Sequence, residues 1–164
     1  MWPQRVKKIV SGGQTGVDRG GLDAAIALGL PHGGWCPRGR RAEDGPIDAG
    51  YRLQTTTSAD YRVRTRRNVL HSDGTLLFCS GPLSGGTRLT ATFAVCCSRP
   101  YHIVDFSAFA SGADGETAQL HRVAAWLICE EIGVLNIAGP RESRQRGIAH
   151  RTERFLCRLL SEGP

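Results

Sequence analysis

Three glycine-rich turns constrain the fold of this chain more than any other feature of its sequence. They lie at residues 11–16 (SGGQTG), 84–87 (SGGT) and 138–143 (AGPRES), and each follows a short apolar run typical of a buried strand. In a parallel sheet, the turns from strands into helices gather along one edge, where free backbone N–H groups and helix dipoles favour an anion. These first, second and third glycine turns therefore predict an α/β protein that binds a phosphate-bearing ligand.

The pattern between the turns predicts one Rossmann-like domain over residues 1–164, a three-layer α/β fold with a mostly parallel, doubly wound sheet flanked by helices. Apolar runs predict strands at residues 6–11, 32–36, 75–80, 101–106 and 134–138. Helical periodicity predicts helices at residues 19–28, 58–71, 87–97, 116–132 and 147–160. Residues 37–47, rich in Gly, Pro and Arg, are expected to form an irregular loop.

Composition narrows the class of protein. Hydrophobic residues make up 40% and charged residues 22% of the chain, as in ordinary soluble globular proteins. No apolar run approaches the ~20 residues of a membrane span, and no signal-peptide pattern precedes the first strand, so a cytoplasmic location is expected. The net charge of +6 suits an anionic ligand, while nucleic acid is a lesser alternative because no RNA-binding motif accompanies the arginines. Histidines and cysteines lack metal-ligand spacing, so no metal site is expected.

The first and second glycine turns supply the main binding candidates, because glycine lets the backbone approach a phosphate closely. The candidates are Gly12, Gly13, Gln14, Thr15 and Gly16 in the first turn, and Ser84, Gly85, Gly86 and Thr87 in the second. Asp18 follows the first turn, where it can cap the helix or accept a hydrogen bond from a sugar hydroxyl. The first turn has neither the Gly-Lys-Ser/Thr ending of a Walker loop nor the spacing of a dinucleotide fingerprint, and a plain tight turn is the alternative for each of the two.

Further candidates come from the third turn and from the arginine-rich helix. Gly139, Arg141 and Ser143 follow the last predicted strand, and Arg141 can bind phosphate in bidentate fashion or form a surface pair with Glu142. Arg62 and Arg66, spaced i and i+4, can clamp an anion or simply make a basic surface.

The loop at residues 33–45 looks like a cover for a ligand. Trp35 is available to stack on a base or pterin, and the adjacent Cys36 has no assigned role. Glu43 and Asp44 are paired carboxylates, so with Asp18 they are candidate general acids or bases, against the alternative of plain surface charge.

The chain resembles the family known as putative molybdenum carriers, or circularly permuted YpsA-like proteins, within the SLOG group of Rossmann-like proteins. The resemblance covers nearly the whole chain and is carried by residues 11–18 (SGGQTGVD), 32–37 (HGGWCP), 40–45 (RRAEDG), 65–68 (TRRN), 72–75 (SDGT), 85–87 (GGT) and 136–143 (NIAGPRES). It implies a ligand such as a nucleotide or molybdenum cofactor, with the phosphate on the first and second turns. It also implies a homo-oligomer, a dimer or tetramer.

The wider group includes the lysine decarboxylase-like (LOG) phosphoribohydrolases, and this chain departs from them at one point. The hydrolases carry a catalytic glutamate shortly after the second glycine turn, whereas here Arg88, Leu89, Thr90 and Ala91 follow Thr87. By the same similarity, Arg62 or Arg66 matches the arginine that precedes the second turn. The expected function is therefore a non-catalytic carrier or sensor of a phosphorylated small molecule. Cleavage of a nucleotide N-glycosidic bond by Asp18, Glu43 or Asp44 is the alternative, and a nucleic-acid-associated module is third.

Overall fold

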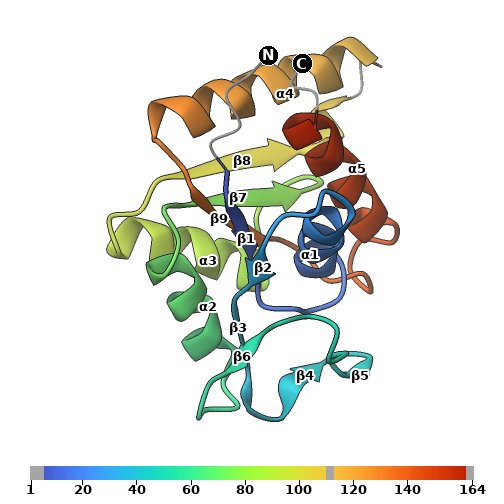
Figure 1. The fold of residues 1–164 in the computed structure, drawn as a ribbon. Helices are drawn as coiled ribbons and strands as arrows, with labels where there is room; N and C mark the ends of the chain where they lie inside the picture. Colours follow the sequence, from blue (N-terminus) through green and yellow to red (C-terminus); the bar gives the residue numbers. More distant parts are fainter. Residues whose placement is uncertain (1–5, 110–112, 162–164) are drawn as a thin grey trace.

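A five-stranded parallel sheet forms the centre of the computed structural model, which describes residues 6–109 and 113–161. Its strand order is β2 (His32–Gly33), β1 (Lys8–Val10), β9 (Val134–Ala138), β7 (Gly74–Cys79) and β8 (Tyr101–Asp105). Every pairing within this sheet is parallel, and the last strand, β9, lies between β1 and β7 (Figure 1). The predicted parallel sheet is thereby confirmed.

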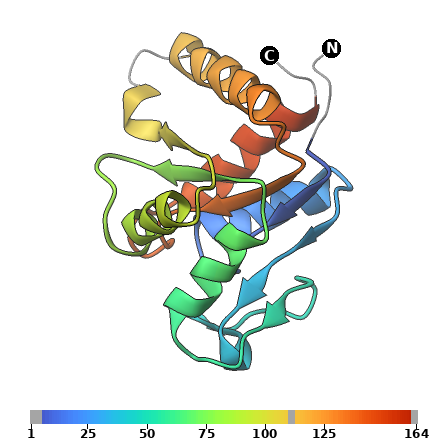
Figure 2. The same ribbon diagram turned by 90° about the vertical axis from the view of Figure 1, so that its left-hand side faces the viewer.

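Helices cover both faces of the sheet and make it three-layered. On one face, α1 (Val17–Ala27), α4 (Ala113–Cys129) and α5 (Ile148–Ser161) share a single apolar core with the strands. On the other face, α2 (Tyr61–Leu70) packs against α3 (Gly85–Cys96), and the two lie together in front of the sheet in Figure 2. The described helices include none with the length and apolar character needed to cross a membrane.

The core explains why these segments adopt these structures. All six residues of β7 are buried, as expected for a strand covered on both faces. One face of α5 is also buried, and Phe155 on that face lies with its ring 5.5 Å from that of Phe78 and 6.3 Å from that of Phe106. Edge-to-face contacts of this kind add to the apolar burial that fixes α5 on the sheet.

The segment between β2 and α2 differs from the prediction. The strand expected at residues 32–36 is two strands, because Gly34 has φ +124° and turns the chain away from the main sheet. β3 (Trp35–Cys36) then pairs with β6 (Gln54–Thr55), and the chain between them forms a 3-10 turn (Arg38–Arg40) and the short hairpin of β4 (Arg41–Ala42) and β5 (Gly45–Pro46).

One arginine holds this segment together. The Arg40 guanidinium donates hydrogen bonds to the carbonyls of Ile47, Asp48, Tyr51 and Leu53, at 2.7–3.2 Å. The Arg40 side chain thus ties residues 47–53 to the loop that was predicted to be irregular.

Truncating Phe155 tests the account of the core. We expect Phe155→Ala to lower the free energy of unfolding by about 3–5 kcal/mol, because it leaves a cavity under the sheet. Val95→Ala is the matched control, since Val95 is 65% exposed on α3 and its truncation should change stability by less than about 0.5 kcal/mol. Urea denaturation measures both, and similar losses for the two variants would contradict this packing.

Candidate functional site

A cleft of about 600 Å³ opens at the carboxyl edge of the sheet, between the ends of β9 and β7. After β9 the chain runs to α5 on one face of the sheet, and after β7 it runs to α3 on the other face. The two connections therefore diverge and leave a crevice between them. Crevices at such switch points are where doubly wound sheets bind ligands. The cleft is lined by parts of all three glycine turns together with the start of α2.

The second glycine turn presents unpaired backbone donors to this cleft. Ser84 is the N-cap of α3 but makes no capping hydrogen bond, and Gly85 and Gly86 are exposed. Within the described residues, no acceptor is found for the N–H groups of Gly85 and Gly86, whereas those of Thr87 and Arg88 reach back to the Ser84 carbonyl. A Cβ atom at Gly85 or Gly86 would meet no atom within 4 Å. This helix end is therefore open to an anion.

The first glycine turn, in contrast, uses its donors internally. The N–H of Gly13 donates to Ser11 Oγ (3.3 Å), that of Gln14 to Asp18 Oδ2 (3.2 Å), and that of Thr15 to the Gln14 side chain (3.0 Å). Side chains of the protein itself, among them the Asp18 carboxylate, thus accept bonds that a phosphate would otherwise accept. Gly12 and Gly16 serve packing, because a Cβ atom there would lie 1.7 Å from the Arg64 guanidinium and 2.3 Å from the Pro140 carbonyl, respectively.

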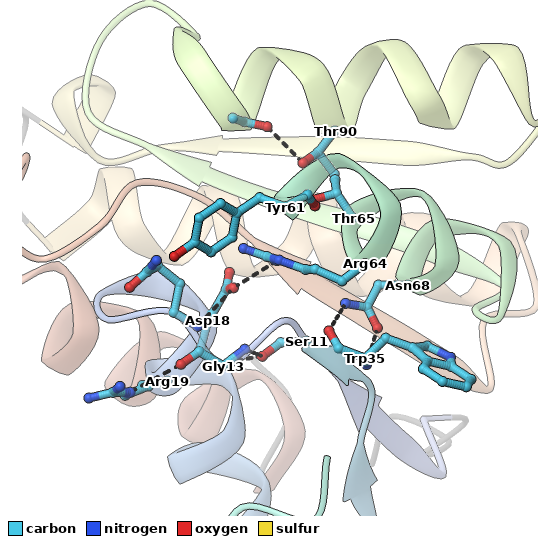
Figure 3. A network of polar contacts seen from close by, with 12 residues as sticks. Ser11, Gly13, Asp18, Arg19, Trp35, Tyr61, Arg64, Thr65, Asn68 and Thr90 are labelled. Carbon is cyan, nitrogen blue, oxygen red and sulfur yellow. Dashed lines mark hydrogen bonds and ion pairs between the residues drawn. The ribbon is translucent and has the colours of Figure 1, made fainter. Parts of the chain in front are cut away.

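A buried ion pair joins the first turn to α2. The Arg64 guanidinium lies 3.2 Å from Asp18 Oδ2, and the two side chains are 13% and 5% exposed. Burial raises the pKa of the Asp18 carboxyl, and the positive charge of Arg64 offsets part of that rise. Figure 3 shows Arg64 reaching from α2 toward Asp18, with the Tyr61 ring beside it.

Arg64 is the arginine that sequence reasoning missed. Arg62 lies at the rim of the cleft and is exposed, while Arg66 is exposed and does not line the cleft. The available signal was helical spacing, because Tyr61, Arg64 and the buried Asn68 recur at i, i+3 and i+7 on one face.

The side-chain amide of Gln14 completes the buried end of the cleft. Its Oε1 accepts hydrogen bonds from the N–H groups of Thr15 (3.0 Å) and Glu43 (2.9 Å), so its Nε2 points away from them. Nε2 is buried without a hydrogen-bond partner, and so is Nε of Arg64. Buried donors in this state are uncommon and call for an explanation.

Glu43 and Asp44 do not line the cleft. They instead fix the loop at residues 33–45 to neighbouring parts of the chain. Glu43 accepts hydrogen bonds from the hydroxyls of Ser143 and Thr15, and these bonds hold the pKa of its carboxyl below the usual range. Asp44 forms a bidentate pair with Arg19. The hydroxyls of Thr15 and Ser143, predicted to bind ligand, are thus used to fix the loop that carries Glu43.

Trp35 is placed apart from the cleft. Its backbone N and O exchange hydrogen bonds with the Asn68 amide (2.7 and 2.9 Å), and its indole N–H donates to His71 Nδ1 (3.0 Å). Arg67 covers the ring at 4.5 Å. Cys36, next in the chain, is fully buried, and burial raises the pKa of its thiol, which makes it an unreactive core residue.

The third glycine turn brings an arginine over the mouth of the cleft. Gly139 passes so close to β7 that a Cβ atom would lie 2.6 Å from the Phe78 carbonyl. Arg141 is exposed, and its guanidinium lies 5.3 Å from the centre of the Tyr61 ring. Glu142 does not pair with it; its carboxylate instead accepts hydrogen bonds from the N–H groups of Gly147 and Ala149 and caps α5.

Among residues 6–109 and 113–161, no group of three or more His, Cys, Asp or Glu side chains is placed to hold a metal ion.

Comparison with known proteins identifies the family and supports the fold. The model of the circularly permutated YpsA SLOG family matches residues 9–160. A crystal structure named "Putative molybdenum carrier protein", from Syntrophus aciditrophicus SB, superposes with a TM-score of 0.88 at 41% sequence identity, covering 93% of each chain. A search of curated proteins gave no match.

Removing Arg64 tests the buried ion pair. We expect Arg64→Met to lower the free energy of unfolding by about 3–5 kcal/mol near pH 7, because it leaves the Asp18 charge buried and unpaired. The folded-state pKa of Asp18 then lies further above its unfolded value, so the loss should shrink as the pH falls and the carboxyl takes up a proton.

Denaturation at pH 7 and pH 5 measures this effect. The double variant Asp18→Asn, Arg64→Met is the matched control, since it removes both charges and should recover most of the lost stability. Equal losses at the two pH values, with no recovery in the double variant, would show that the pair does not stabilise the fold in this way.

Proposed function

The chain belongs to the circularly permutated YpsA SLOG family, and we propose that it binds a phosphorylated small molecule in the cleft between β7 and β9, as a carrier or sensor. The observation that carries this proposal is the open amino end of α3. Gly85 and Gly86 offer unpaired N–H groups there, at the wall of a cleft large enough for a nucleotide-sized ligand.

Positive charge around the cleft supports an anionic group. Arg62, Arg141 and Arg144 all line it, and their exposed side chains can turn toward a phosphate. The carboxylate of Asp18 lies at the buried end, so the phosphate is expected at the second glycine turn and the rest of the ligand toward Asp18.

Two kinds of ligand fit this description, a nucleotide and a molybdenum cofactor. The similar crystal structure is named for molybdenum carriage, which favours the cofactor. The described residues include no cluster of metal-ligating side chains. We therefore propose that the protein binds the phosphate and the ring system of the cofactor, and that molybdenum is carried as part of this ligand. A binder is favoured over a hydrolase because Arg88 to Ala91 hold no carboxylate at the position where the related hydrolases carry their glutamate.

A charge at Gly86 tests the phosphate seat. We expect Gly86→Asp to weaken binding of nucleoside monophosphates and pyrophosphate by about tenfold or more, because a carboxylate would repel the phosphate at the helix end. The position has free space, so Gly86→Ala is a matched control that adds the Cβ atom without the charge and should keep most of the affinity. Calorimetric titration measures both variants, and wild-type affinity in Gly86→Asp would contradict the proposal.

A second candidate, cleavage of an N-glycosidic bond, is favoured by one observation. Of the three candidate carboxylates, Asp18 lines the cleft, where it is placed to act as a general acid or base, and burial raises its pKa above the usual value. If this function operates, the protein releases ribose 5-phosphate from a nucleoside monophosphate, and Asp18→Asn abolishes release while Glu43→Gln does not. Chromatography of the products tests it, and absence of turnover across the nucleotides would remove this candidate.

A further inference from the structure

The buried end of the cleft has a fixed pattern of donors and acceptors. We define the inner subsite as Gln14, Asp18, Arg64 and Tyr61, which all line the cleft away from the second glycine turn. Gln14 is 5% exposed, and its amide cannot turn over without losing the bonds from Thr15 and Glu43 to its Oε1. The other end of the side-chain amide, Nε2, can therefore act only as a hydrogen-bond donor.

Arg64 supplies a second fixed donor. Its Nη1 is held by the Asp18 carboxylate at 3.2 Å, and its guanidinium rests against Gly12, where any side chain would displace it. These contacts leave its Nε–H without a partner, as Gln14 Nε2 is. Gln14 and Arg64 both line the cleft with Asp18, so a ligand that supplies an acceptor oxygen to these donors and a donor to the carboxylate would satisfy all three.

The negative charge of Asp18 determines which part of a ligand can bind in the inner subsite. Asp18 repels a phosphate but accepts hydrogen bonds from N–H groups. Its Oδ2 is bonded to the backbone N–H of Gln14 and to Arg64, while the residue lines the cleft. Tyr61 adds an aromatic ring, and the Arg141 guanidinium over that ring is exposed and can be displaced by a planar ligand. The inner subsite thus suits a flat, polar heterocycle.

We propose that the inner subsite recognises a lactam edge, the adjacent ring C=O and N–H shared by 6-oxopurines and pterins. The carbonyl oxygen accepts from Gln14 Nε2 and Arg64 Nε, and the ring N–H, with any neighbouring amino group, donates to Asp18. This assignment rests on the proposed function, because the phosphate at the second glycine turn directs the ring inward. Adenine has the reverse pattern, with an amino group facing two donors and a ring nitrogen facing a carboxylate.

Binding to the wild-type protein provides the test. We measure the affinities of GMP, IMP, AMP, dGMP, neopterin monophosphate and pyrophosphate by calorimetry. GMP, IMP and the pterin phosphate should bind about tenfold or more tightly than AMP, the discrimination typical of a bidentate hydrogen-bond pair. The ratio of pterin phosphate to GMP then tells which of the two sources of the edge is preferred.

The other outcomes separate the two proposals. Equal affinities for GMP, IMP and AMP overturn the lactam assignment but leave phosphate binding intact. A large loss for dGMP, with GMP and AMP equal, assigns the inner subsite to ribose hydroxyls and also overturns it. Failure of every compound, pyrophosphate included, overturns the proposed function itself.

A variant of Gln14 tests the same inference from the protein side. In Gln14→Glu, one oxygen keeps the bonds from Thr15 and Glu43, while the other replaces Nε2 and turns a donor into an acceptor. GMP affinity should fall about tenfold or more, and the preference over AMP should vanish. Gln54→Glu, at an exposed position of β6, is the matched control with the same charge change and should keep the preference. An unchanged GMP to AMP ratio in a folded Gln14→Glu protein would overturn the role of Gln14.

Discussion

The ion pair between Asp18 and Arg64 is the interaction on which the arrangement of the site depends. It joins the turn after β1 to α2, two parts of the chain that meet only because the sheet is parallel and doubly wound. The cost of burying both charges is large, so each must keep its partner. Gly12 lets the guanidinium come close, and the Gln14 N–H gives the carboxylate a further donor.

The position of Asp18 in this pair makes the first glycine turn less available for binding a phosphate. In many Rossmann-like proteins such a turn binds phosphate with its backbone, but here Asp18 accepts from the turn itself. We therefore propose the second turn, where Gly85 and Gly86 remain open, as the anion site. Glu43 binds Thr15 and Ser143, and Asp44 binds Arg19, so these two candidate carboxylates hold the loop over the first turn.

The sequence predicted the fold well because its signals are local. Apolar runs located β7 and β9, the buried stripe located α5, and the glycine turns placed the cleft at the correct edge of the sheet. Contacts between distant segments could not be predicted in the same way. Helical spacing puts Arg64 on the face of Asn68, but only the fold brings that face to Asp18. The Gln14 amide acquires its orientation from Glu43, 29 residues away. Trp35 is predicted to stack on a ligand ring, but Asn68 and His71 of a later segment bind it instead.

The central claim is that the second glycine turn, and not the first, holds the phosphate. Titrating ¹⁵N-labelled protein with pyrophosphate and following the backbone amide signals tests this claim most directly. The account predicts that the largest shifts occur at Gly85, Gly86 and Thr87, while Gly13, Gln14 and Thr15 move little because their N–H groups already have acceptors. Large shifts at the first turn, with none at the second, would contradict it.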